Sequence, residues 1–140
     1  MDKRFEGKTA IVTGGASGLG AACCRRFAQE GASVGILDVN SEMSQALAQE
    51  IADNGGEAVA LHADVTSPES MARAITQITD RYGRLDAAVN NAGIGGNNEA
   101  LEDITADFWN RTIAINLSGV FYAMQAEFPA MAALTMPRLM

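Results

Sequence analysis

Glycines follow the first apolar run of the chain, in the stretch Thr13-Gly14-Gly15-Ala16-Ser17-Gly18-Leu19-Gly20. In a turn from a strand to a helix, Gly14 would permit the tight bend, Gly18 a close approach of backbone to ligand, and Gly20 the packing of helix on strand. The free N–H groups at the start of such a helix hold anions such as a pyrophosphate. Three glycines in a turn can also be purely structural, so the flanking elements have to decide between the two interpretations.

A carboxylate stands at the end of the next apolar run. Asp38 lies 18 residues after Gly20, where a side chain can accept hydrogen bonds from the ribose hydroxyls of an adenosine and would repel a 2′-phosphate. No Lys or Arg occurs in the glycine-rich stretch or directly after Asp38 to neutralise such a phosphate. The sequence therefore predicts NAD rather than NADP as the ligand. Capping of the following helix is a second role open to Asp38, although Asn40 and Ser41 can also fill it.

Short apolar runs alternate with segments of helical periodicity along the whole chain. The expected strands are 9–13, 33–37, 59–62 and 85–89. The expected helices are 18–30, 41–53, 67–83 and 105–134, the second capped by Ser41 and the last weakened or kinked by Gly119 and Pro129. This alternation predicts the α/β class, a Rossmann-like doubly wound parallel sheet that is incomplete at about four strands. We expect residues 1–140 to form one truncated dinucleotide-binding domain.

Three further motifs occur after expected strands or within the last expected helix. They are Asp64-Val65, Asn90-Asn91-Ala92-Gly93 and Ile115-Asn116-Leu117-Ser118-Gly119-Val120. Together with the glycine-rich stretch, which has the pattern TGxxxGxG, they resemble in order and spacing the motifs of the short-chain dehydrogenase/reductase family. The resemblance covers about residues 5–132 and stops near position 133, so we expect residues 133–140 to form a divergent tail.

The resemblance implies cofactor-binding roles at the carboxyl ends of all four strands, where ligands of open α/β sheets bind. The pyrophosphate would be held by Gly14, Ser17, Gly18, Leu19 and Gly20. Asp38 would bind the adenine ribose, and Asp64 and Val65 would border the adenine. The wall beside the nicotinamide ribose would consist of Asn91, Ala92 and Gly93. Asn116 would be the catalytic asparagine, which helps to anchor a water molecule in the family's proton relay.

Purely structural roles stay open for several of these side chains. Asp64 can cap a helix, and Asn90 can stabilise its turn. The single histidine, His62, is interpreted as a core or strand-end residue rather than a catalytic base. Trp109 is expected to pack, and the acidic run that precedes Arg111 is expected to be a solvated face.

The family's catalysis uses Asn, Ser, Tyr and Lys, and this chain matches only the asparagine. The lysine stands four residues after the tyrosine, where its charge lowers the phenol pKa from about 10. Here the only lysines are Lys3 and Lys8, so neither Tyr82 nor Tyr122 can have such a partner. The resemblance therefore implies the N-terminal fragment of an NAD-dependent enzyme that interconverts alcohols and ketones. We expect the fragment alone to be inactive.

Two other functions stay open at this point. The chain could be a non-catalytic NAD-binding or interaction module built on half of the fold. It could also regain a site by pairing with another chain that supplies Ser, Tyr and Lys. The gene downstream of codon 140 discriminates among them, because a frame that encodes a further strand, a serine and YxxxK would support the fragment interpretation.

The composition argues against several classes of partner. The net charge is −7, whereas nucleic acids and anionic membranes require clustered cations. The sequence contains no uninterrupted run of about 18 apolar residues, so it predicts no transmembrane helix. The neighbouring Cys23 and Cys24 point apart on a helix, so we expect neither a disulfide nor a metal site, and a reducing, cytoplasmic location.

The last expected helix is apolar around most of its circumference. In a full-length relative this surface would pack on the sheet, and the resemblance implies that it also packs on a partner subunit. Segment 105–134 is therefore expected to contact a second copy of the chain in a homo-oligomer. The missing strands of the fold are expected beside the first strand, opposite the edge formed by the third. Because an open edge exposes unpaired backbone groups, we expect the isolated chain to self-associate or to be marginally stable.

Overall fold

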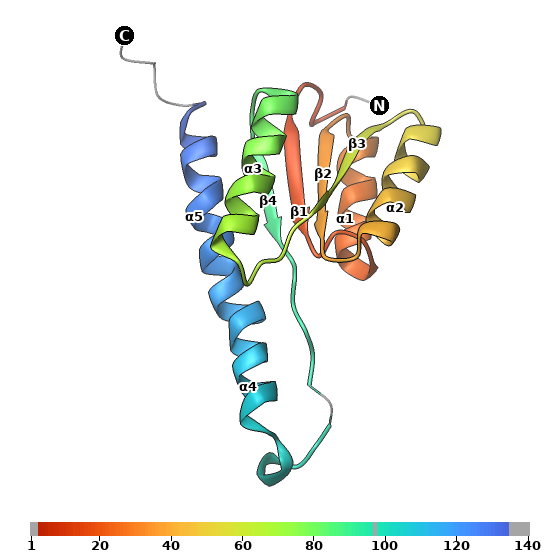
Figure 1. The fold of residues 1–140 in the computed structure, drawn as a ribbon. Coiled ribbons are helices and arrows are strands. Elements are labelled where there is room, and N and C mark those ends of the chain that lie inside the picture. The colour runs from red at the N-terminus through yellow and green to blue at the C-terminus, as the bar shows by residue number, and fades with distance from the viewer. Residues whose placement is uncertain (1–2, 97, 135–140) are drawn as a thin grey trace.

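The structure is a computed structural model that describes residues 3–96 and 98–134. Its sheet consists of β1 (Thr9–Thr13), β2 (Ser33–Asp38), β3 (Glu57–His62) and β4 (Ala87–Asn90). All neighbouring strands are parallel, in the order β3-β2-β1-β4. β1 is central, and all five of its residues are buried, as its run of apolar and β-branched residues predicts. The expected α/β class with an incomplete parallel sheet is confirmed (Figure 1).

Helices cover both faces of this sheet. They are α1 (Gly18–Gln29), α2 (Ser41–Asp53), α3 (Pro68–Tyr82), α4 (Ala106–Ile113), the π-helical turn η2 (Ala114–Ser118) and α5 (Gly119–Ala132). A short 3₁₀ turn, η1 (Leu101–Asp103), which the sequence did not predict, precedes α4. Each of the predicted helical segments therefore exists, and the last of them is divided by η2.

Side chains that alternate along the strands belong to two separate hydrophobic cores. Ala10 and Val12 of β1 face a core that α1 and α2 cover, whereas Ile11 faces a core that α3 and α5 cover. Gly35 of β2 lies on the second side, where a Cβ atom would come within 2.5 Å of Cδ1 of Ile78. The missing side chain at this position lets α3 lie close to the sheet.

The helix starts show which polar residues act as caps. The Asn40 side chain accepts a hydrogen bond from the backbone N–H of Met43 at 3.0 Å, so Asn40 caps α2 and the expected cap Ser41 is its first residue. Ser67 caps α3 by accepting from Ser70 N–H, and Gly83 ends that helix with a positive φ of 76°. The start and stop expected for α3 are thus confirmed.

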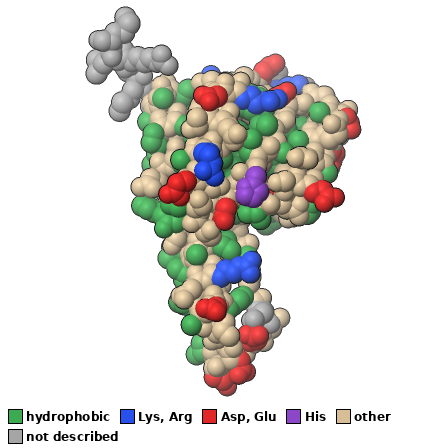
Figure 2. Space-filling view, in the orientation of Figure 1, with side chains coloured by type: hydrophobic (Ala, Val, Ile, Leu, Met, Phe, Trp, Pro, Cys, Tyr) green, Lys and Arg blue, Asp and Glu red, His purple; other side chains and the backbone are tan. Residues whose placement is uncertain are grey.

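α4, η2 and α5 follow one another as a continuous helical segment that extends past the sheet (Figure 1). The irregularity lies at Ala114–Ser118, directly before Gly119, while α5 continues through Pro129 to Ala132. Acidic side chains gather at the far end of this projection, as expected for a solvated face (Figure 2). Within the described residues, no helix combines the length and apolar character that crossing a membrane requires.

The two edge strands of the sheet are β3 and β4. The expectation that missing strands would lie beside β1 is wrong, because β4 pairs with β1 in register from Ala10 with Ala87 to Thr13 with Asn90. Among the described residues, the open edge opposite β3 therefore belongs to β4. His62 is exposed at the end of β3, so its strand-end interpretation holds and its core interpretation does not.

A buried carboxylate ties the N-terminal segment to α1. Glu30 is 6% exposed, and its Oε1 accepts hydrogen bonds from the guanidinium groups of Arg4 at 2.8 Å and Arg26 at 2.5 Å. The hydrogen bond from Arg4 contributes most to lowering the pKa of Glu30 to about 2. Because the carboxylate is ionised in the fold well below its ordinary pKa, it stabilises the folded chain at neutral pH.

We predict that Glu30→Gln destabilises the chain at pH 7 and that the difference from wild type shrinks on acidification. A depressed folded-state pKa contributes stability above the unfolded-state value of about 4.3. That contribution disappears as the pH falls from there toward the folded-state pKa of about 2. Urea denaturation between pH 2 and 7 measures this, with Glu99→Gln at an exposed loop position as the control. A pH-independent difference would contradict the prediction.

Candidate functional site

A cleft of about 460 Å³ lies at the carboxyl end of the sheet, where the segments that follow all four strands meet. Most residues that the sequence singles out line it: Gly14, Ser17, Leu19, Asp38, Asp64, Val65, Asn91, Ala92 and Gly93. The structure thus brings together residues that are up to 79 positions apart. Three others, Gly18, Gly20 and Asn116, do not line the cleft.

Gly20 lies behind the cleft at the tightest contact of the glycine-rich turn. A Cβ atom at this position would be 2.1 Å from the carbonyl oxygen of Gly14 and 2.7 Å from Nδ2 of Asn91. Gly14 has a positive φ of 61°, and a Cβ there would come within 2.9 Å of Cα of Ala92. The turn can therefore press against both its own helix and the segment after β4 only because these side chains are missing.

The start of α1 differs from the other helix starts around the cleft. Its N-cap residue, Ser17, makes no side-chain capping hydrogen bond, whereas α2, α3 and α4 are capped by Asn40, Ser67 and Thr105. Ser17 and Leu19 also line the cleft. Uncapped N–H groups at the positive end of a helix can receive an anion, and here they border an open cavity.

The Asp38 carboxylate joins the end of β2 to the glycine-rich turn. Its Oδ2 accepts the backbone N–H of Ala16 at 3.0 Å, and its Oδ1 accepts the backbone N–H of Asn40 at 2.9 Å. The helix cap itself is Asn40, so the capping alternative for Asp38 is wrong. Each carboxylate oxygen has a second lone pair, so Asp38 can position the turn and still accept a ligand hydroxyl.

Asp64 and Val65 form the part of the cleft that follows β3. Oδ1 of Asp64 accepts the backbone N–H of Thr66 at 2.9 Å and its hydroxyl at 2.7 Å, a local turn that orients the carboxylate. The cap of α3 is Ser67, so the helix-cap alternative for Asp64 is wrong. Val65 packs against Gly119, where a Cβ would lie 2.8 Å from its Cγ2.

The segment after β4 is fastened to the end of β1. The hydroxyl of Thr13 accepts the backbone N–H groups of Asn91 at 3.0 Å and Ala92 at 3.1 Å. The Asn91 side chain in turn donates to the carbonyl oxygens of Thr13 and Gly14 at 3.2 and 3.1 Å. Asn91 therefore holds two walls of the cleft together as well as lining it.

Asn116 fixes the same segment from the helical side. Its Oδ1 accepts the backbone N–H of Ile94 and its Nδ2 donates to the carbonyl oxygen of Ile94, both at 2.8 Å. The side chain comes from η2, the π-helical turn, and both its polar atoms are used in this contact. In the structure Asn116 positions the cleft wall, and its catalytic role stays a prediction.

A buried polar pair lies behind this wall. Nδ2 of Asn90 donates to Oε2 of Glu127 at 3.0 Å, which links β4 to α5. Glu127 is 1% exposed, and burial raises the pKa of its carboxyl group while the hydrogen bond from Asn90 lowers it. Oδ1 of Asn90 and Oε1 of Glu127 are buried, and neither has a hydrogen-bond partner in the described part of the chain. The Asn90 side chain thus bonds to a helix and does not stabilise its own turn.

The sequence assigned no binding role to five of the lining residues, although the last of them belongs to a quoted motif: Val39, Ala63, Ile94, Arg111 and Ile115. The first three are immediate neighbours of predicted residues, so widening each motif by one position would have found them. Arg111 and Ile115 are four residues apart and therefore share a helix face. That spacing was visible in the sequence, but only the fold shows that this face meets the cleft.

Outside the cleft, the described His, Cys, Asp and Glu side chains are candidate metal ligands, and the cysteines are candidate reactive thiols. Among residues 3–96 and 98–134, no three His, Cys, Asp or Glu side chains are placed to hold a metal ion. Cys23 and Cys24 are both free thiols, and burial raises the pKa of Cys24 to about 12. Cys24 is therefore a packing residue of the first core, as expected.

A parallel sheet, a glycine-rich turn into an uncapped helix and a carboxylate after the second strand define a Rossmann-like α/β fold. A family model described as short chain dehydrogenase matches residues 8–136, and the chain belongs to that family.

Similar proteins agree with this assignment. The chain is 39% identical to cyclohexanol dehydrogenase of Acinetobacter sp. strain SE19, over 95% of this chain and 53% of the relative. It is 42% identical to sorbitol dehydrogenase of Cereibacter sphaeroides, over 93% of this chain and 49% of the relative. A short-chain type dehydrogenase/reductase from Mycobacterium marinum superposes with a TM-score of 0.90 at 34% identity, covering 96% of this chain and 54% of that structure. The chain thus spans about half the length of the curated relatives it matches.

We predict that Gly20→Ala destabilises the chain and disrupts the cleft. The added methyl group would meet backbone of the adjoining turn, which cannot move aside as a flexible side chain could. Overpacking of this kind costs about 1–3 kcal/mol, and more where backbone must shift. Urea denaturation measures the loss, with Gly95→Ala as the control because a Cβ there meets no atom of the described residues within 4 Å. Equal stability of the two variants would contradict the packing argument.

Proposed function

We propose that this chain is the NAD-binding portion of an oxidoreductase that transfers hydride between a nicotinamide cofactor and an alcohol or ketone. The observation that carries the proposal is the position of Asp38, a carboxylate that lines the cleft and is fixed to the glycine-rich turn through Ala16. The relatives named above are dehydrogenases of cyclohexanol and sorbitol, which supports an alcohol as the substrate class.

The residues of the cleft fit an adenine dinucleotide. The uncapped start of α1 and the glycine-rich turn would hold the pyrophosphate, with Ser17 and Leu19 at the cavity, Gly18 exposed between them and Gly20 buried behind the turn. Val65 would border the adenine beside Asp64. Asn91, Ala92 and Gly93 would line the wall next to the nicotinamide ribose. When bound, NAD supplies the group that accepts or returns the hydride.

The charge of Asp38 supports NAD over NADP. Both of its oxygens already accept a backbone N–H, so the carboxylate has a fixed position in the cleft wall. A ribose with free hydroxyls can donate to the remaining lone pairs. A 2′-phosphate at that position would place two negative charges against each other.

Asp38→Asn tests the cofactor assignment. We expect wild type to bind NAD at least about tenfold more tightly than NADP, and the variant to lose most of this preference, because removal of one charge relieves a repulsion of roughly 1.4 kcal/mol. Asparagine keeps one carbonyl oxygen for the N–H of Ala16, which limits damage to the turn. Calorimetry with both nucleotides measures the ratio, and Asp80→Asn on the exposed side of α3 is the matched control. Tighter binding of NADP by wild type would refute the assignment.

Hydride transfer by the whole protein requires groups beyond those of this chain. The family's proton relay uses Ser, Tyr and Lys, and here neither Tyr82 nor Tyr122 has a lysine four residues on. The family's fourth catalytic residue, an asparagine, is matched in this chain by Asn116, whose amide holds Ile94. We propose that residues 1–140 form the dinucleotide-binding portion, with a divergent tail from residue 133, of which 135–140 lie outside the described residues. A cytoplasmic location belongs to the same proposal.

We predict that the purified chain does not oxidise alcohols. In the family the proton of the substrate oxygen is taken by a tyrosine whose phenol pKa a lysine four residues later lowers, and this chain has no such pair. Absorbance at the NADH band, followed with cyclohexanol or sorbitol and NAD, should remain at the level of a protein-free blank. Turnover that follows the protein through purification would show that the chain contains a complete site.

We further propose that segment 105–134 mediates association with a second copy. Large apolar side chains on it are exposed, including Trp109, Leu117 at 64%, Phe121 at 56% and Phe128 at 62%. Trp109 is 60% exposed, so the described residues leave most of its surface uncovered, whereas the sequence led us to expect that it packs. Large apolar side chains that are exposed together on one segment are typical of a surface that a partner covers.

The combined variant Leu117→Gln and Phe121→Gln tests this surface. We expect the wild-type chain to sediment as a concentration-dependent oligomer and the double variant to shift toward monomer, because the apolar area that drives association is lost. Leu101→Gln is the control, since Leu101 is 84% exposed but lies in η1 outside the segment. A monomeric wild-type profile at all concentrations would refute the proposal.

A further inference from the structure

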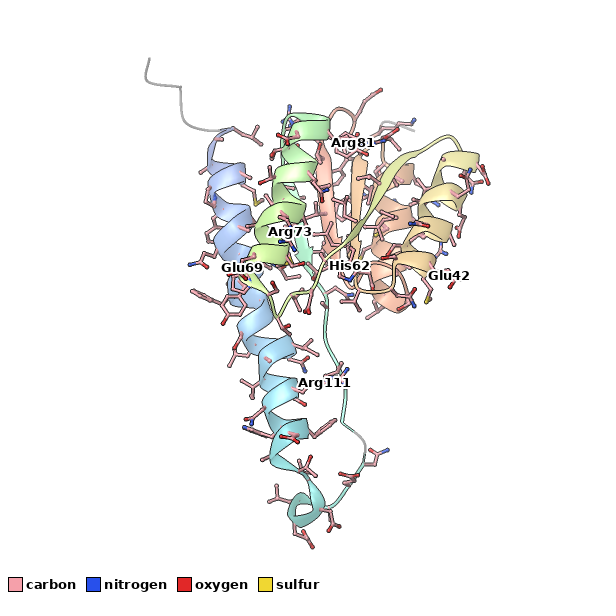
Figure 3. All side chains as sticks on the ribbon, viewed as in Figure 1. Glu42, His62, Glu69, Arg73, Arg81 and Arg111 are labelled. Atoms are coloured by element: carbon pink, nitrogen blue, oxygen red, sulfur yellow. The ribbon has the colours of Figure 1, made fainter. Side chains whose placement is uncertain are left out.

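Arg111 is a cation in the cleft that the sequence motifs did not include. It lines the cavity from α4, one helical turn before Ile115, which lines the same cavity. Figure 3 shows its side chain leaving α4 on the side of the segment that descends from β4. Within residues 3–96 and 98–134, its guanidinium has neither a salt bridge nor a side-chain hydrogen bond. The group is available to a ligand.

The charged side chains of the cleft indicate which kind of ligand Arg111 can bind. The other charged side chains that line it are Asp38 and Asp64, so the described wall carries two negative charges and one positive charge. An anionic ligand would be repelled by both carboxylates and attracted only by the α1 N-terminus and Arg111. Arg111 is therefore the one side chain of the described cleft whose charge favours phosphate.

The two attractive groups lie on different walls. α1 packs on the sheet face of the first core, whereas α4 continues through η2 into α5, which packs on the face of the second core. Ser17 at the start of α1 and Arg111 of α4 line the same cleft, an arrangement that allows one phosphate to face both groups. The guanidinium offers parallel N–H donors that match phosphate oxygens, and its long side chain can cover the distance across a cleft.

We propose that Arg111 binds the pyrophosphate of the dinucleotide from the wall opposite α1 and so positions the ligand in the cleft. This assignment rests on the proposed nucleotide-binding function and adds to it a residue outside the glycine-rich turn. It also qualifies the sequence argument on cofactor choice, because a cation does line the cleft, although not next to Asp38 in the chain.

The test compares ligands that carry different parts of the dinucleotide. Calorimetry would measure the affinities of wild type, Arg111→Gln and Arg111→Lys for adenosine, ADP, NAD and NADP. Arg73→Gln is the matched control, because Arg73 is exposed on α3 and lies outside the cleft (Figure 3). Its substitution removes the same charge as Arg111→Gln. Thermal unfolding of each variant checks that the fold is unchanged.

We expect Arg111→Gln to weaken ADP and NAD by about tenfold, the size of one charge-assisted hydrogen bond, and to leave adenosine unchanged. Arg111→Lys should keep part of the affinity because the charge remains, and Arg73→Gln should match wild type. Added salt should weaken ADP binding more in wild type than in Arg111→Gln.

Three results would overturn the assignment while leaving the proposed function intact. Unchanged ADP affinity in Arg111→Gln would show that the side chain does not reach phosphate. An equal loss for adenosine and ADP would place the guanidinium on the purine ring instead. A loss confined to NADP would assign it to a 2′-phosphate. If wild type binds none of the four ligands, the proposed function fails and the role of Arg111 fails with it.

Discussion

The cleft depends on the contact between the turn after β1 and the segment after β4. The Asn91 amide donates to the carbonyl oxygens of Thr13 and Gly14, and it occupies the space that a side chain at Gly20 would need. The hydroxyl of Thr13 completes the contact by accepting two backbone N–H groups of the opposite segment. Because β1 is the central strand, this contact fixes the start of α1 relative to the whole sheet.

The helical segment on the other side of the cleft is held by other contacts. The π-helical turn η2 lies between α4 and α5 and carries Asn116, which binds the backbone of Ile94 with both polar atoms of its amide. Directly after it, Gly119 allows contact with Val65. π-helical turns inside α-helices are common at functional sites. Here the turn joins the helix, the loop after β4 and the loop after β3 in one region.

Three features of the described residues leave polar or apolar groups without partners beyond the cleft. Among the described residues, the outer edge of β4 has no neighbouring strand, and α5 exposes Phe121 and Phe128. Oε1 of Glu127 and Oδ1 of Asn90 are buried and have no hydrogen-bond partner among the described residues, and such atoms cost free energy unless a partner or water reaches them. All three observations are consistent with a chain that spans about half the length of its relatives.

Sequence patterns alone determined the elements of the α/β fold and most of the cleft. Strand and helix periodicities, the glycine-rich turn and the acid after β2 are local signals, because each depends on neighbours within a few residues. From the sequence, Asn40 and Ser41 could each cap α2. The structure identifies Asn40 as the cap, because its side chain accepts the hydrogen bond from Met43 N–H. Tertiary structure also decided that β4 is the open edge, that Trp109 is exposed and that Arg111 enters the cleft. These depend on which distant segments pack together, and such contacts leave no periodic signal in one sequence.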